Sequence, residues 1–161
     1  LFEQETQIST HTQIYQLVLT TMTMLKGEFG LDTYIDHGEW LGYLGTPVAL
    51  RLGVNAICGP REIDAPNPPR VDTDGRIQSV SGGYQSRGME NVGFNTDAPV
   101  VPGEELIVQA SMGVRYGFDG SRMQAVADDR SPVTSTMSLS VAKYSPGRIF
   151  GASRPNLFGC V

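Results

Sequence analysis

The chain has 161 residues, of which 40% are hydrophobic, so it is long enough to bury a core of its own. Charged residues make up only 18%, the formal net charge is -5, and ten arginines and two lysines are scattered along the sequence. This balance argues against nucleic-acid binding, and no apolar run is long enough to span a membrane. We expect one domain over residues 1–161, helical over 8–44 and forming a sheet over 46–161.

The clearest helical pattern lies at the start of the chain, from Ile8 to Leu25. It includes His11, for which we predict no functional role. Its apolar face, which we expect to pack on the core or on another subunit, is formed by Tyr15, Val18, Met22 and Leu25. Gly27 can end this helix. A second, shorter helix is predicted from Asp32 to Leu44, with Asp32 as its cap.

The rest of the chain has strand-like patterns separated by loops. Thr46–Ile57 resembles a buried strand, and loops rich in proline and glycine are expected over residues 59–75 and 81–104. Apolar residues then alternate with polar ones in Leu106–Phe118 and Val133–Val141, as in an antiparallel sheet with one solvated face. The predicted fold class is α+β, with an N-terminal amphipathic helix packed on a mainly antiparallel β-sheet.

A cluster of polar residues in the second predicted helix offers candidate chemistry. A histidine beside a carboxylate can act as a general base, which makes Asp36 and His37 a candidate catalytic pair. Asp32 and Glu39 add carboxylates, but on a helix His37 would point about 100° away from Asp36, so these side chains do not converge on a metal. The alternative is a solvated helix face. No metal site and no cofactor are predicted.

The two cysteines, Cys58 and Cys160, allow two interpretations. A disulfide between them would close a loop of about a hundred residues and tie down the C-terminal end, contributing roughly 4–5 kcal/mol in the chain-entropy model. Alternatively, both are unpaired thiols that pack as small hydrophobic residues. We predict the disulfide between Cys58 and Cys160.

Two families resemble the chain in outline. The order of amphipathic helix, Gly/Pro-rich loop, antiparallel sheet and late cysteine is similar to the globular part of bacterial pilins and pseudopilins. The segment IYQLVLTTMTML, followed by DHGEW and a strand, resembles the start of nuclear-transport-factor-2-like domains, in which helices wrap a curved sheet into a cone. The second resemblance implies a small enzyme or ligand-binding domain that uses Asp36 and His37.

The main functional hypothesis is a structural subunit rather than an enzyme. Rows of serine and threonine on the exposed faces of the predicted strands, with few lysines to protect the sheet edges, favour packing against identical neighbours. The sequence therefore predicts a self-associating subunit of an extracellular filament or virion-type particle. Its expected partner is a second copy of itself.

Overall fold

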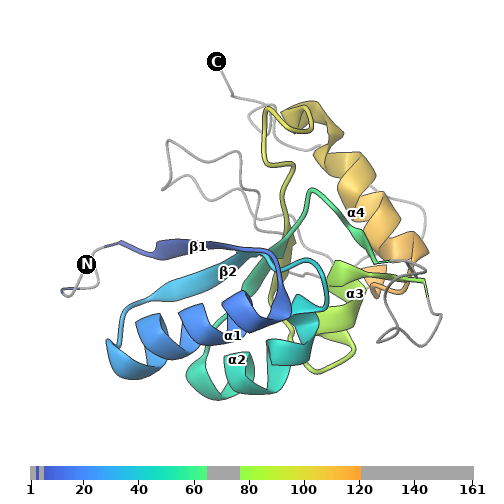
Figure 1. Cartoon of the computed structure of the whole chain (residues 1–161). Coiled ribbons are helices and arrows are strands. Elements are labelled where there is room, and N and C mark those ends of the chain that lie inside the picture. The colour runs from blue at the N-terminus through green and yellow to red at the C-terminus, as the bar shows by residue number, and fades with distance from the viewer. Residues whose placement is uncertain (1–2, 4–5, 65–76, 121–161) are drawn as a thin grey trace.

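The computed structural model describes residue 3, residues 6–64 and residues 77–120. Its centre is a sheet in the order β1-β2-β3-β6, formed by β1 (Ile8–Thr12), β2 (Thr33–His37), β3 (Ala56–Cys58) and β6 (Val92–Phe94). Each neighbouring pair in this sheet is parallel (Figure 1). Thr12 is in register with His37, His37 with Cys58 and Cys58 with Phe94, so the four strands end at one common edge.

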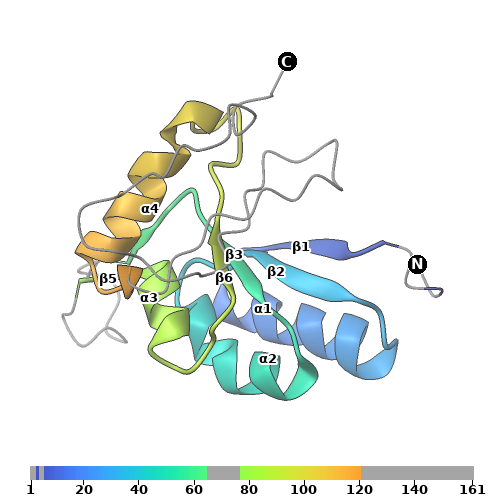
Figure 2. The same cartoon turned by 180° about the vertical axis from the view of Figure 1, so that it is seen from behind.

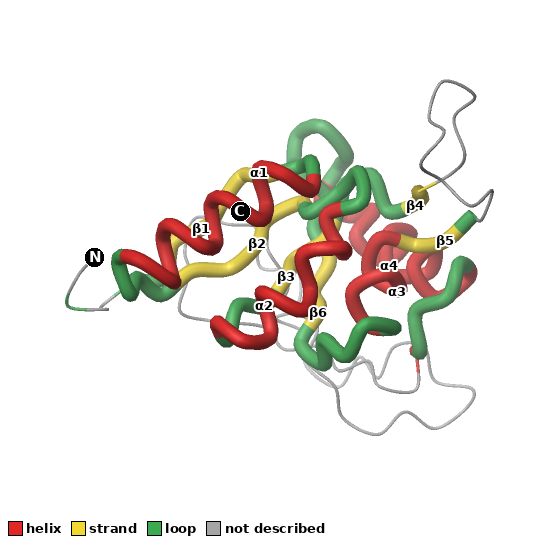
Figure 3. Tube along the Cα trace, turned by 60° about the horizontal axis from the view of Figure 1, so that its bottom comes forward, coloured by secondary structure: helices red, strands yellow, loops and turns green. Residues whose placement is uncertain are grey.

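Two helical segments cover one face of the sheet. They are α1 (Tyr15–Met22), which continues as η1 (Thr23–Glu28), and η2 (Gly42–Gly45), which leads into α2 (Thr46–Leu52). Opposite views show α1 and α2 on the same side of the strands (Figure 1 and Figure 2), and in Figure 3 both helices lie in front of the sheet. Helices that follow successive parallel strands on one face are typical of βα units wound in a single direction.

The core lies between these helices and the sheet. Val18 and Met22, one helical turn apart on α1, are buried together with Ile35 of β2 and Phe94 of β6. Pro47 occupies the first turn of α2, where its missing N–H costs nothing, and Gly53 ends the helix at a φ of 69°.

The second part of the described chain packs beside β6. It contains the antiparallel pair β4 (Ile63–Asp64) and β5 (Gln78–Ser79), then α3 (Val80–Gln85), η3 (Gly103–Glu105) and α4 (Leu106–Arg115). Gly113 allows α4 to come close, since a Cβ there would lie 2.7 Å from the Phe94 ring. No helix in residues 6–64 and 77–120 is long and apolar enough to cross a membrane.

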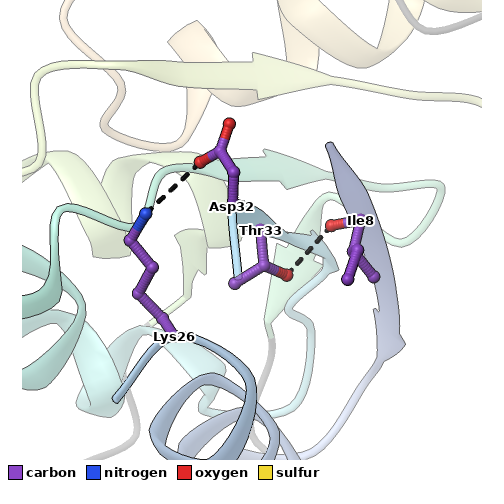
Figure 4. Close-up of polar contacts among 4 residues, drawn as sticks. All are labelled: Ile8, Lys26, Asp32 and Thr33. Carbon is purple, nitrogen blue, oxygen red and sulfur yellow. Dashed lines mark hydrogen bonds and ion pairs between the residues drawn. The ribbon is translucent and has the colours of Figure 1, made fainter. Parts of the chain in front are cut away.

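Polar side chains join β1 and β2 at their amino ends. The Thr33 hydroxyl donates to the Ile8 carbonyl at 2.9 Å, and Lys26 Nζ lies 3.4 Å from Asp32 Oδ1 (Figure 4). Asp32, predicted to cap a helix, instead precedes a strand and pairs with the end of η1.

The predicted fold class is wrong, because the main sheet is parallel and begins before the first helix. The predicted leading helix over Ile8–Leu25 is a strand at Ile8–Thr12, and only from Tyr15 onward is it helical. Within the second predicted helix, residues 33–37 also form a strand. Thr-rich, β-branched segments pack well on a pleated surface, and burial in the sheet outweighed the helical spacing of the apolar residues.

The two segments assigned to antiparallel strands also need correction. Residues Leu106–Arg115 form helix α4. A short pattern of alternating apolar and polar residues fits a half-buried helix as well as a strand. Val133–Val141 lies outside the described residues. The strand predicted over Thr46–Ile57 is divided into α2 and the short β3, with a left-handed Gly53 between them.

Candidate metal centre

The carboxyl ends of the parallel strands bring three potential metal ligands together. His11 lies near the end of β1, His37 is the last residue of β2, and Asp97 follows β6. One ligand atom from each of these residues lies within 4.8 Å of the others. The two imidazole rings meet edge to face, with centroids 4.3 Å apart. Two imidazole nitrogens and a carboxylate oxygen are a ligand set used by zinc and other divalent transition metals.

His37 is the most constrained of the three ligands. Its side chain is buried, and its Nδ1 lies within hydrogen-bonding distance of the Gly59 carbonyl oxygen. Because a carbonyl can only accept, Nδ1 carries the proton, and Nε2 is left with the lone pair that a metal needs. A hydrogen bond of this kind orients a histidine ligand and raises its basicity.

The backbone around the ligands is strained. Four non-glycine residues of the described chain have positive φ, and all lie at this edge: His37, Trp40, Leu41 and Asp97. Such conformations cost free energy and persist only where the surrounding structure imposes them. Two of these four residues, His37 and Asp97, are themselves potential ligands, which supports a functional role for this edge.

Asp36 links the three ligand-bearing segments. Its carboxylate accepts hydrogen bonds from the Ser9 hydroxyl at 2.9 Å and from Asn95 Nδ2 at 2.6 Å, and from the backbone N–H of His37 at 3.1 Å. Ser9 lies two residues before His11, and Asn95 lies two residues before Asp97. Asp36 therefore contacts each segment that carries a potential ligand: Ser9 near His11, Asn95 near Asp97, and the backbone of His37 itself. The predicted Asp36–His37 pair is a different contact, between the carboxylate and the imidazole.

Glu39 and Arg61 form a second layer beside the ligands. The Glu39 Oε1 accepts the Arg61 backbone N–H at 2.9 Å, and Arg61 Nη1 lies 3.9 Å from Oε2. Burial raises the pKa of Glu39, while the backbone N–H and charge of Arg61 and the nearby His37 act in the opposite direction. The guanidinium of Arg61 lies 4.5 Å above the centre of the Trp40 ring.

A further buried carboxyl, Glu62, lies between β3 and α3. It accepts hydrogen bonds from the hydroxyl and backbone N–H of Ser81, while its Oε2 has no hydrogen-bond partner in residues 6–64 and 77–120. Burial is the main cause that raises the pKa of Glu62 to about 8, and the Ser81 hydrogen bonds oppose it.

Cys58 requires a correction, because it is a free, buried thiol and the predicted disulfide is not seen. Cys160 lies outside the described residues. Burial raises the pKa of Cys58 well above its ordinary value, so the thiolate is disfavoured and the side chain packs as part of the core.

The remaining predicted residues lie on the helical layer. Val18 and Met22 are buried beneath the sheet, while Tyr15 and Leu25 are half-buried. His11 and Asp97 were not predicted as potential ligands, because His11 was expected inside a helix and Asp97 within the loop over residues 81–104.

Comparison of the chain with protein-family models, with curated proteins and with solved structures gives no match.

Proposed function

We propose that this chain carries the divalent-metal site of a metal-dependent hydrolase, with His11, His37 and Asp97 as the ligands. The observation that carries the proposal is the convergence of these three side chains within 4.8 Å. Three protein ligands are the number used in catalytic zinc sites, where the metal keeps a position for water and lowers its pKa toward neutrality.

The place of the cluster supports the same conclusion. Parallel α/β proteins and β/α barrels bind and transform their substrates at the carboxyl ends of the strands, where loops supply the reactive groups. The cluster lies at this edge, with His37 oriented by Gly59 and with Asp36 connecting the three segments.

Zinc binding can be measured directly, since both histidines of the chain belong to the cluster. We expect about one zinc per chain after dialysis, and zinc-induced shifts of both imidazoles in ¹H–¹⁵N spectra. His11→Ala, His37→Ala and Asp97→Ala should each weaken zinc binding by at least tenfold, because each removes one of three ligands.

Asp32→Asn is the matched control, since Asp32 lies at the amino end of β2 and pairs with Lys26. Zinc affinity unchanged in folded His11→Ala and His37→Ala variants would overturn the proposal. A loss of affinity in Asp32→Asn equal to that in Asp97→Ala would do the same.

Self-association into an extracellular filament or particle stays a prediction from sequence. One of the two strands on which its hydroxyl rows were placed is helix α4, and the other lies outside the described residues. Sedimentation of the purified chain over a range of concentrations would test it.

A further inference from the structure

We propose that Arg61 forms a carboxylate-binding subsite beside the metal centre, so that the substrate carries a carboxylate group near the bond that is cleaved. This inference rests on the proposed function, and it assigns a class of substrate to the same site. The proposal is based on the position of Arg61, on its stacking on Trp40 and on guanidinium donors that have no hydrogen-bond partner among the described residues.

Arg61 lies at the edge that carries the ligands. It follows the end of β3 by three residues, after Cys58, while His37 ends the neighbouring strand β2. Glu39, two residues after His37, connects the two segments by accepting the Arg61 backbone N–H at 2.9 Å.

The guanidinium is held in a defined orientation. It lies over Trp40 with its carbon 4.5 Å from the ring centre, and an aromatic face in this position fixes the plane of an arginine. The outward-pointing donors of a stacked guanidinium match the two oxygens of a carboxylate.

Arg61 also keeps donors for a ligand. Its charged partner Glu39 is 3.9 Å away, which is beyond hydrogen-bonding distance, and its side chain makes no other polar contact within the described chain. The Arg61 side chain is 55% exposed and that of Glu39 is 3% exposed. A solute that approaches from water therefore meets the guanidinium before the carboxylate.

A carboxylate fits this arrangement better than a phosphate. Phosphate sites combine several cations with helix N-termini or clusters of backbone N–H groups. Lys26, the one lysine in residues 6–64 and 77–120, lies at the opposite edge of the sheet, where it pairs with Asp32. A single stacked arginine next to a divalent metal instead suits a small acid whose carbonyl group reaches the metal.

The test uses the zinc-loaded protein and two probes, N-acetylglycine and N-acetyl-β-alanine, with their uncharged methyl esters. Trp40 is the single tryptophan of the chain, so its fluorescence reports directly on a ligand bound at Arg61. We expect at least one acid to change the fluorescence saturably, and to bind about tenfold or more tightly than its ester.

Arg61→Ala should weaken binding of that acid by about tenfold or more. Arg61→Lys keeps the charge but loses the planar guanidinium with its paired donors, so its affinity for the acid should lie between those of Arg61→Ala and the unaltered protein. Arg51→Ala is the matched control, because Arg51 is an exposed arginine on α2 whose guanidinium donates to the Pro47 carbonyl. It should bind the acid like the unaltered protein.

Zinc content is measured for every variant, which separates the two proposals. Loss of zinc from the unaltered chain would overturn the metal site. Retained zinc together with equal binding of acid and ester, no saturable signal from either acid, or unchanged binding in Arg61→Lys and Arg61→Ala would overturn the carboxylate subsite alone. If Arg61→Ala fails to fold or to hold zinc, Arg61→Lys decides the result.

Discussion

Asp36 shows how a residue without a ligand role can determine a site. Its two carboxylate oxygens accept hydrogen bonds from Ser9, Asn95 and the His37 backbone, and each donor belongs to a segment that supplies one ligand. An outer-layer contact of this kind commonly changes metal affinity by one or two orders of magnitude. Asp36 is thus a positioning residue in the proposed site.

Asp36→Asn should lower zinc affinity by about 10–100-fold, because an amide presents one acceptor oxygen where the carboxylate presents two. Competition with a chromophoric chelator measures the affinity, and a urea titration establishes whether the variant is folded. Asp32→Asn serves again as the control carboxylate. A folded Asp36→Asn variant with the affinity of the unaltered protein would exclude this positioning role.

Glu62 is the residue that should couple folding to pH. Burial raises its pKa to about 8 in the folded chain, compared with an ordinary value of 4.5. The folded state therefore holds this proton more tightly than the unfolded state does, and protonation favours folding. The contribution is fully present below about pH 4.5, and it is lost as the pH rises toward 8, with a slope of up to about 1.4 kcal/mol per pH unit.

Glu62→Gln should remove this dependence, since glutamine keeps the shape without the proton equilibrium. Urea unfolding at several pH values between 5 and 9 measures the difference in the free energy of unfolding between the two proteins. We expect Glu62→Gln to gain stability relative to the unaltered chain as the pH rises. A difference that is constant across this range would show that the pKa of Glu62 is not raised in the folded state.

Helix α1 contributes one face to the core between the helices and the sheet. Its buried residues, Val18 and Met22, lie one turn apart, while Leu17 on the same helix is 54% exposed. The same helix therefore offers both a core position and a solvent position for one substitution.

Met22→Asp should destabilise the fold by several kcal/mol, because an unpaired charge would enter a core position that is 1% exposed. Leu17→Asp, the matched control, should change stability by less than about 1 kcal/mol. Thermal melts of the two variants give the comparison. Equal melting temperatures would contradict the placement of this helix face.

The direction of the strands decides where function can lie in the whole molecule. In a parallel sheet every carboxyl end meets at one edge, so residues from β1, β2 and the segment after β6 come together although they are distant in the sequence. The fold predicted from sequence placed His11 and His37 on two different helices and Asp97 in a loop, so it gave no reason for these residues to meet.

The composition and the local patterns determined several features without the structure. They located a helix over the residues of α1, and they indicated that no helix crosses a membrane, which holds for the part of the chain that the structure describes. Each of these follows from neighbouring side chains, since helical spacing, hydropathy and charge act over a few residues.

Only the tertiary structure decided the parallel sheet and the ligand set. A short alternating segment such as Leu106–Arg115 can satisfy a strand or a half-buried helix, and packing against β6 selected the helix. His11 and Asp97 carry no sign of their role in their own neighbourhoods. They lie beside His37 because strand pairing in register with β2 and β3 brings the ends of β1 and β6 to the same edge, and strand pairing depends on the burial of the whole sheet rather than on local propensity.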